Sequence, residues 1–133
     1  MLGTIVKSLG KLWKSDGHEE LSTPQNAEAE FALVYENLPV GTLSLKDGKW
    51  TFRYTEPFKR QDKIKPLPDF PDINKVYTSE ELYPFFIQRI PSLSQPKVKE
   101  AIEKEKIDQT SIVELLKKFG RLSINNPFKL EAN

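Results

Sequence analysis

The sequence predicts an α+β fold, in which a small antiparallel β-meander packs against about three α-helices. Three short runs in the first half of the chain alternate apolar and polar side chains, as strands with one buried face do. The second half instead carries apolar side chains at helical spacing. A chain of 133 residues without internal repeats suits one domain with a single modest core.

The predicted strands are the runs FALVYE (31–36), GTLSLK (41–46) and KWTFRY (49–54), and the segment NLPVG is expected to turn the chain between the first two. Asp47-Gly48 predicts a type I′ hairpin between the second and third, because both central residues of that turn need positive φ. The third run gathers three aromatic side chains on one face: Trp50, Phe52 and Tyr54. Such an apolar face needs a cover.

The next segment, residues 56–77, is rich in proline. A regular helix and a central strand are excluded there by four residues: Pro57, Pro66, Pro68 and Pro71. A connection of this length is unusual in a compact domain unless it is functional or held in place. We therefore expect an ordered, extended segment that wraps the domain, with one short strand at residues 64–67.

The first predicted helix contains two adjacent phenylalanines. Thr78 and Glu81 match a capping box that would open a helix over residues 79–90. Adjacent residues lie about 100° apart on a helix, so only Phe86 joins its apolar stripe. Phe85 is expected to point to a flank, toward the aromatic face of the sheet or the proline-rich segment. Both are interpreted as closing the core between sheet and helix, and so as marking the fold more than the function.

Two further helices and a tail are predicted. Pro96 suits the first turn of the second helix. Asp108 or Ser111 can cap the third helix, which is expected to stop at Gly120. Residues 121–130 are expected to pack back on the domain or to add an edge strand.

The N-terminal 30 residues are interpreted as an amphipathic leader and a polar linker, possible sites of disorder, ahead of a domain over residues 31–133. Residues 1–14 place apolar side chains at helical spacing with three lysines opposite. They predict either a helix that docks on a partner or an anionic membrane surface, or a frayed leader. No apolar run is long enough to span a membrane. The absence of cysteine suits the cytoplasm, where we expect the protein.

No catalytic, cofactor-binding or metal site is predicted. The chain has no Cys and a single His, His18, in a polar stretch, so the usual nucleophile and base cannot be assembled. It has no Gly-rich phosphate loop and no metal-ligand spacing. Asp69 and Asp72 leave open a small enzyme that uses paired carboxylates, although both suit turns between prolines.

The charge of the chain argues against nucleic acid as a direct partner. The formal net charge is only +1, far from the strong positive field of most autonomous nucleic-acid binders. The basic run KRQDKIK (59–65) is interpreted as a solvated loop in preference to a nucleic-acid contact, because few basic residues release few counterions.

The order of these parts resembles the N-terminal subdomain of HipA-like toxin kinases over residues 31–125. In that family a strand pair with a G-x-L step leads to an F-x-Y strand, and a segment like LFPFF and a Leu-Pro or Ile-Pro step follow later. The matching positions in this chain are Gly41, Leu43, Phe52, Tyr54, Tyr83, Pro84, Phe85, Phe86, Ile90 and Pro91. The chain departs from the long kinases after this last proline, where PSLSQP stands in place of the usual Glu-Gly. The catalytic-loop Asp/Asn pair and the Mg-binding Asp of the kinase core cannot be placed.

The resemblance implies a stand-alone protein like the HipS component of tripartite HipBST toxin–antitoxin systems. Such a protein is a non-enzymatic antitoxin that binds and restrains a separately encoded HipA/HipT-like serine/threonine kinase. The alternative is a structural subunit of a split HipA-like kinase, required for its activity. A HipB-like DNA-binding protein would be reached through the kinase. No cofactor, no direct nucleic acid and no membrane partner is expected, although a membrane adaptor that uses residues 1–14 stays open.

The predicted partner contacts are Lys59, Arg60 and Phe70. They belong to the basic, proline-stiffened segment 57–73. A preorganised loop loses less entropy when it docks, which favours this segment as part of a binding surface.

Overall fold

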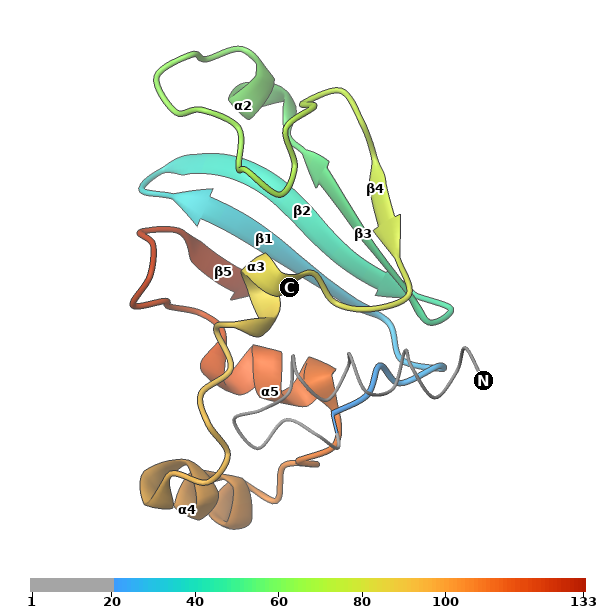
Figure 1. Cartoon of the computed structure of the whole chain (residues 1–133), viewed down its shortest axis with the longest axis vertical. Helices are drawn as coiled ribbons and strands as arrows, with labels where there is room; N and C mark the ends of the chain where they lie inside the picture. The colour runs from blue at the N-terminus through green and yellow to red at the C-terminus, as the bar shows by residue number, and fades with distance from the viewer. Residues whose placement is uncertain (1–20) are drawn as a thin grey trace.

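The structure is a computed structural model that describes residues 21–133, and the predicted leader over residues 1–14 lies outside this range. The α+β fold is confirmed. A five-stranded antiparallel sheet, with strand order β4-β3-β2-β1-β5, lies beside the helices (Figure 1). Its three central strands are the predicted meander: β1 (Ala29–Tyr35), β2 (Leu38–Lys46) and β3 (Lys49–Tyr54).

The first hairpin is tighter than predicted. NLPVG does not turn the chain, because β1 and β2 are joined by Glu36 and Asn37 alone, with Glu36 at φ 53°. Pro39 lies within β2 opposite Val34, and the register of the pairing shifts between Leu33 and Val34. The second hairpin is as predicted, with Asp47 at φ 52° and Gly48 at φ 74°.

Gly41 allows a close approach between two strands of the sheet. A Cβ atom built on this residue would lie 2.4 Å from Cζ of Phe52 and 2.9 Å from the carbonyl oxygen of Arg53. Gly41 pairs with Tyr54 on β3, and the ring of Phe52 lies across its backbone. The glycine of the G-x-L step is therefore required by the aromatic ring of the F-x-Y strand.

The proline-rich segment is ordered, as expected, but its local structure differs. The predicted strand at residues 64–67 is absent from the described chain, and a short helix α2 (Glu56–Lys59) opens the segment instead. The hydroxyl of Thr55 caps α2 by accepting from the N–H of Phe58, and Pro57 fits its first turn. The segment closes with β4 (Tyr77–Ser79), which pairs with β3 at the edge of the sheet.

The predicted helix over residues 79–90 is wrong in its extent. Only α3 (Pro84–Ile87) is helical. Ser79 belongs to β4, and its hydroxyl accepts from the N–H of Glu81 in a local turn. Pro84 drives Tyr83 into an extended conformation with ψ 146°, so the helix cannot begin before the proline.

The last three elements agree with the sequence. Helix α4 spans Pro96–Glu105, and α5 spans Ile112–Phe119 with the hydroxyl of Ser111 accepting from Glu114 N–H at its N-cap. Helix α5 stops at Gly120, where a Cβ would lie 2.5 Å from the carbonyl oxygen of Leu116. The tail adds the edge strand β5 (Lys129–Ala132) beside β1.

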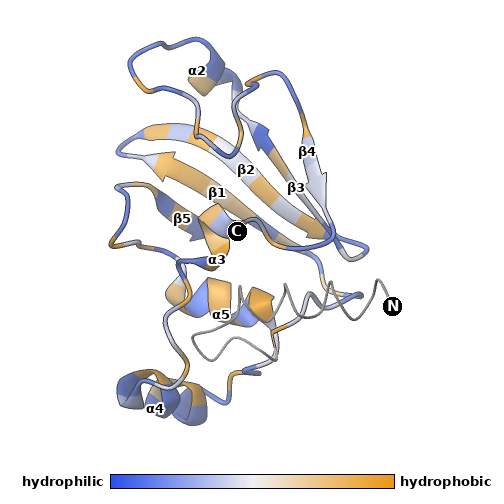
Figure 2. Cartoon of the chain, viewed as in Figure 1, coloured by the Kyte–Doolittle hydropathy of each residue, from blue (hydrophilic) through white to orange (hydrophobic). Residues whose placement is uncertain are grey.

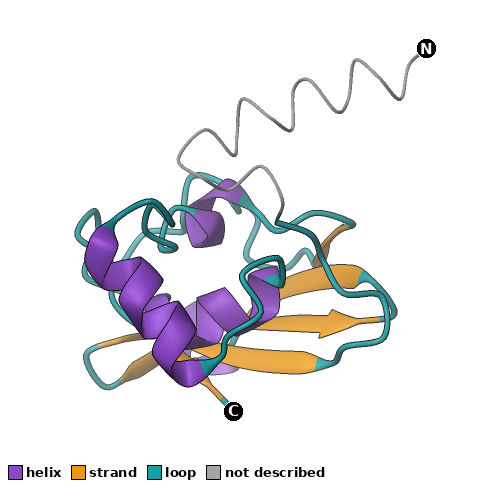
Figure 3. Ribbon diagram, turned by 90° about the horizontal axis from the view of Figure 1, so that it is seen from below, coloured by secondary structure: helices purple, strands orange, loops and turns teal. Residues whose placement is uncertain are grey.

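The core lies between one face of the sheet and the helices, where the apolar residues of Figure 2 gather; Figure 3 shows the helices on one side of the strands. Phe52 is its centre, with its ring stacked on Phe70 at 4.3 Å between centroids and in contact with Phe86 at 5.7 Å. The buried sheet side chains that join it include Phe31, Leu33, Leu43, Leu45, Trp50, Tyr54 and Leu130.

The packed part of the domain begins before residue 31. Leu21 is buried, and Ser22 forms a parallel bridge with Ser111. The indole N–H of Trp50 donates to the hydroxyl of Thr23 at 3.0 Å. Part of the segment predicted as a linker therefore packs against the domain.

Candidate partner-binding surfaces

The acidic pair considered for catalysis lies in solvent. Asp69 and Asp72 are both exposed, and Asp72 accepts from the N–H of Asn74 within a turn. Within residues 21–133, no group of three His, Cys, Asp or Glu side chains is placed to hold a metal ion. The described helices include none that is long and apolar enough to cross a bilayer.

The three predicted partner contacts are placed differently. Arg60 is exposed, and Lys59 is half-buried, with its ammonium 3.6 Å from the carboxylate of Glu56. Phe70 lies in the core with 1% of its side chain exposed. Its ring does not reach the surface, because it fills the space between Phe52 and the chain before α3. Arg60 and Lys59 stay predictions.

The residues that carry the resemblance to HipA-like kinases are structural in this fold. Leu43, Phe52, Tyr54 and Phe86 are buried, and Pro91 follows the turn that ends α3. Phe85 was expected to face the aromatic strand or the proline-rich segment, but its ring contacts Phe86 at 5.1 Å and Phe128 of the tail at 6.1 Å. The PFF sequence thus joins the core to the C-terminal part of the chain.

Tyr54 fastens the proline-rich segment to the sheet. Its hydroxyl donates to the carbonyl oxygen of Phe70 at 2.6 Å and accepts from the N–H of Leu67 at 2.8 Å. Burial is the main cause that raises the pKa of Tyr54 to about 12, and burial also raises the pKa of Tyr83 to about 12. The folded protein therefore favours the neutral phenol at both positions.

Tyr54→Phe is expected to lower the free energy of unfolding at pH 7 by about 1–3 kcal/mol, because it leaves the buried carbonyl of Phe70 and N–H of Leu67 unpaired. A second effect appears in alkali. The folded pKa of about 12 exceeds the unfolded value near 10, so stability that is present below pH 10 is lost as the pH rises through 12. The variant should lose less stability over this interval, as measured by urea unfolding at pH 9 to 12.

The matched control is Tyr35→Phe, at a half-buried tyrosine whose ring contacts Phe128. Taking the difference between the wild type and each variant removes the contributions of the other titrating groups. Equal alkaline slopes for the wild type and Tyr54→Phe would contradict the assignment.

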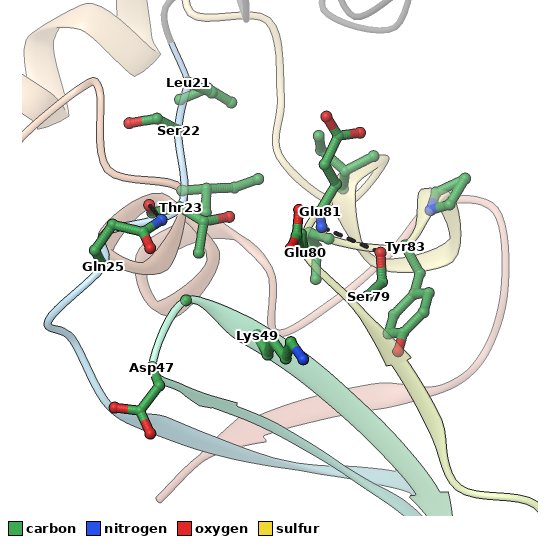
Figure 4. A pocket seen from close by; sticks show the side chains of 15 residues that line it. Leu21, Ser22, Thr23, Gln25, Asp47, Lys49, Ser79, Glu80, Glu81 and Tyr83 are labelled. Atoms are coloured by element: carbon green, nitrogen blue, oxygen red, sulfur yellow. Dashed lines mark hydrogen bonds between the residues drawn. The ribbon is translucent and has the colours of Figure 1, made fainter. Parts of the chain in front are cut away.

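One groove crosses the surface near the start of the described chain. It has a volume of about 630 Å³ and lies between the N-terminal segment, the β2–β3 turn and the residues that precede α3 (Figure 4). Its lining includes apolar side chains, among them Leu21, Leu82, Ile87 and Ile112. Its charged lining residues are Asp47, Lys49, Glu80 and Glu81. Because acidic residues outnumber the single lysine in this lining, the groove suits a basic side chain of a binding partner whose stem is apolar.

The tail loop, defined as residues 120–128 between α5 and β5, is held by one buried arginine. Arg89 is 4% exposed. Its Nη1 donates to the carbonyl oxygens of Gly120 and Arg121 at 3.0 and 3.3 Å. Its Nη2 donates to Oδ1 of Asn126 at 3.0 Å and to the carbonyl oxygen of Phe128 at 2.9 Å. Both ends of the loop are thereby fixed to the segment that carries α3.

The guanidinium of Arg89 is held by neutral oxygens. Burial lowers the pKa of Arg89 to about 10, which still leaves it charged at pH 7. Within residues 21–133, its Nε is the buried side-chain nitrogen that lacks a hydrogen-bond partner. The charge faces the carbonyl groups at the C-terminal end of α5, where the helix dipole is negative, and this favours a cation.

The tail loop exposes two large apolar side chains. Leu122 is 58% exposed and Ile124 is 102% exposed. Val76, at 49%, is the other large apolar side chain exposed within the described residues. Sequence patterning did not single out this surface, because the loop follows a helix end and reads as an unspecific tail.

The elements and surfaces together define a small α+β domain whose surface offers a groove and an apolar loop. Residues 31–124 match the family model of the HipA N-terminal domain. The chain therefore belongs to the HipA N-terminal domain family. The domain that defines this family is the non-catalytic subdomain of HipA-like kinases. A comparison with curated proteins finds no match.

Proposed function

We propose that this protein is an antitoxin-like protein that binds and restrains a separately encoded HipA/HipT-like serine/threonine kinase. Membership of the HipA N-terminal domain family carries the proposal. A non-catalytic subdomain of a kinase presents surfaces that complement a kinase core. A related core encoded elsewhere can be bound through the same kind of contact.

The surfaces of the domain support a binding role. Protein interfaces combine a few buried anchors with a polar rim. The exposed Arg60 and the half-buried Lys59, on the segment held by Tyr54, fit such a rim. A HipB-like DNA-binding protein would join the assembly through the kinase.

Co-expression with a HipA/HipT-like kinase encoded beside this chain tests the proposal. We expect the two proteins to purify together, the toxicity of the kinase to be relieved, and autophosphorylation of the purified kinase to fall as this protein is added. The kinase expressed alone is the control. A rise in autophosphorylation would instead indicate a structural subunit of a split kinase. Absence of both a complex and growth rescue would refute both roles.

A further inference from the structure

The tail loop leaves two large apolar side chains exposed to water. Each leaves most of its apolar surface in water, whereas burying a Leu or Ile side chain is favourable. Leu122 and Ile124 lie two residues apart at 58% and 102% exposure. Exposed apolar side chains that lie near one another and are rimmed by polar residues mark candidate interaction sites.

The loop is also preorganised. Arg89 holds the backbone at both ends of the loop through Gly120, Arg121 and Phe128, and it holds the side chain of Asn126. The N–H of Leu130 donates to the carbonyl oxygen of Arg121 at 2.9 Å and closes the loop at its base. A loop fixed in this way loses little conformational entropy when it docks.

The charge around the loop selects the chemistry of the partner. Residues 117–133 contain four basic side chains and one acidic side chain, which gives +3: Lys117, Lys118, Arg121, Lys129 and Glu131. Ion pairs join Lys118 to Glu105 and Arg121 to Glu131, so the excess that stays unpaired is +2. Lys117 and Lys129 are exposed beside the loop. A second copy that presented the same surface would bring like charges together, so a partner with acidic side chains fits better.

We propose that Leu122 and Ile124 of the tail loop are the anchors through which this protein docks on its kinase, in an apolar pocket flanked by acidic side chains of that kinase. This inference rests on the proposed function and adds the surface that performs it. Arg89 is a positioning residue in this arrangement, because it holds the backbone of the loop and touches no partner atom.

The test is the double variant Leu122→Ser/Ile124→Ser in the full chain, with affinity for the purified HipA/HipT-like kinase measured by calorimetry. We expect the dissociation constant to rise about 10- to 100-fold, since two apolar anchors are removed and each factor of ten corresponds to about 1.4 kcal/mol. The thermal midpoint should stay unchanged, because both side chains are exposed. Val76→Ser is the matched control, as it removes an exposed apolar side chain elsewhere, and its affinity should stay within about twofold.

A second variant tests the role of the exposed lysines beside the loop. Lys117→Glu/Lys129→Glu is expected to slow association and to weaken its dependence on salt, because exposed charges act mainly on the encounter rate. Wild-type affinity in the double apolar variant would overturn the docking surface and leave the proposed function standing. Failure of the wild type itself to bind would overturn both. A dimer of the wild type that the double variant dissolves would assign the loop to a contact between copies instead, and would also overturn the inference.

Discussion

Phe70→Ala is expected to lower the free energy of unfolding by about 3–5 kcal/mol, the range for truncating a buried phenylalanine. The ring stacks on Phe52 at 4.3 Å and meets Tyr77 and Tyr83 edge-on at 5.0 Å. Truncation would leave a cavity among these rings, which the stiff, proline-bounded chain on either side cannot collapse to fill. Urea unfolding followed by circular dichroism measures the loss.

The same residue distinguishes a core role from a contact role. Phe70→Leu keeps most of the volume, so it should cost less stability than Phe70→Ala and leave affinity for the proposed kinase partner unchanged. Pro71→Ala, at the exposed neighbour, serves as the control and should change stability by about 0.5 kcal/mol or less. A stable Phe70→Ala variant that fails to bind the kinase would show that the ring reaches the partner after all.

Arg89→Met is expected to lower the free energy of unfolding by about 3 kcal/mol. Replacing a buried charge by an apolar side chain can be neutral when its partner charge is replaced too. Here the partners are mainly backbone carbonyl groups, which stay in place and lose their donors. Each unpaired buried acceptor costs about 1–3 kcal/mol, and relief of the desolvation of Arg89 offsets only part of the sum.

Urea unfolding measures the free energy of unfolding of Arg89→Met, and two further variants serve as comparisons. Arg89→Lys keeps the charge but not the planar fork that serves two nitrogens at once, so we expect a loss between those of the wild type and Arg89→Met. Arg60→Met removes an exposed arginine and should stay within about 0.5 kcal/mol of the wild type. If Arg89→Met were as stable as the wild type, the cost of burying the guanidinium would equal the value of its four hydrogen bonds.

The three central strands were predictable because their signals are local, whereas the strand expected at residues 64–67 is absent from the described residues and β4 was not predicted. Alternation defines the meander, and Asp47-Gly48 fixes the hairpin through the two positive φ angles that the turn demands. The capping pattern at Thr78 and Glu81 is equally local, yet the helix that it predicts does not begin there. Tertiary pairing draws Tyr77–Ser79 into the sheet against β3, and Pro84 then sets a later helix start.

The exposure of the candidate contact residues was harder to predict, because burial depends on where distant segments meet. Phe70 looked like an exposed anchor on a proline-rich loop, but Tyr54 draws that loop onto the sheet by bonding to its backbone. The sequence did contain a sign that Arg89 is buried. Arg89 lies three residues after Phe86 and seven after Leu82, on the apolar stripe of the predicted helix. Arginine at such a position calls for buried acceptors.

The hold of Arg89 on both ends of the tail loop has a consequence for deuterium exchange. Short C-terminal strands at a sheet edge usually fray on their own, and their amides exchange quickly. Here β5 cannot leave β1 without disturbing Phe128, and Phe128 is bonded to an arginine anchored beside Phe86 in the centre of the molecule. The last strand and the middle of the chain should therefore open as one cooperative unit, and the amides of β5 that bond to β1 should exchange as slowly as those of the core.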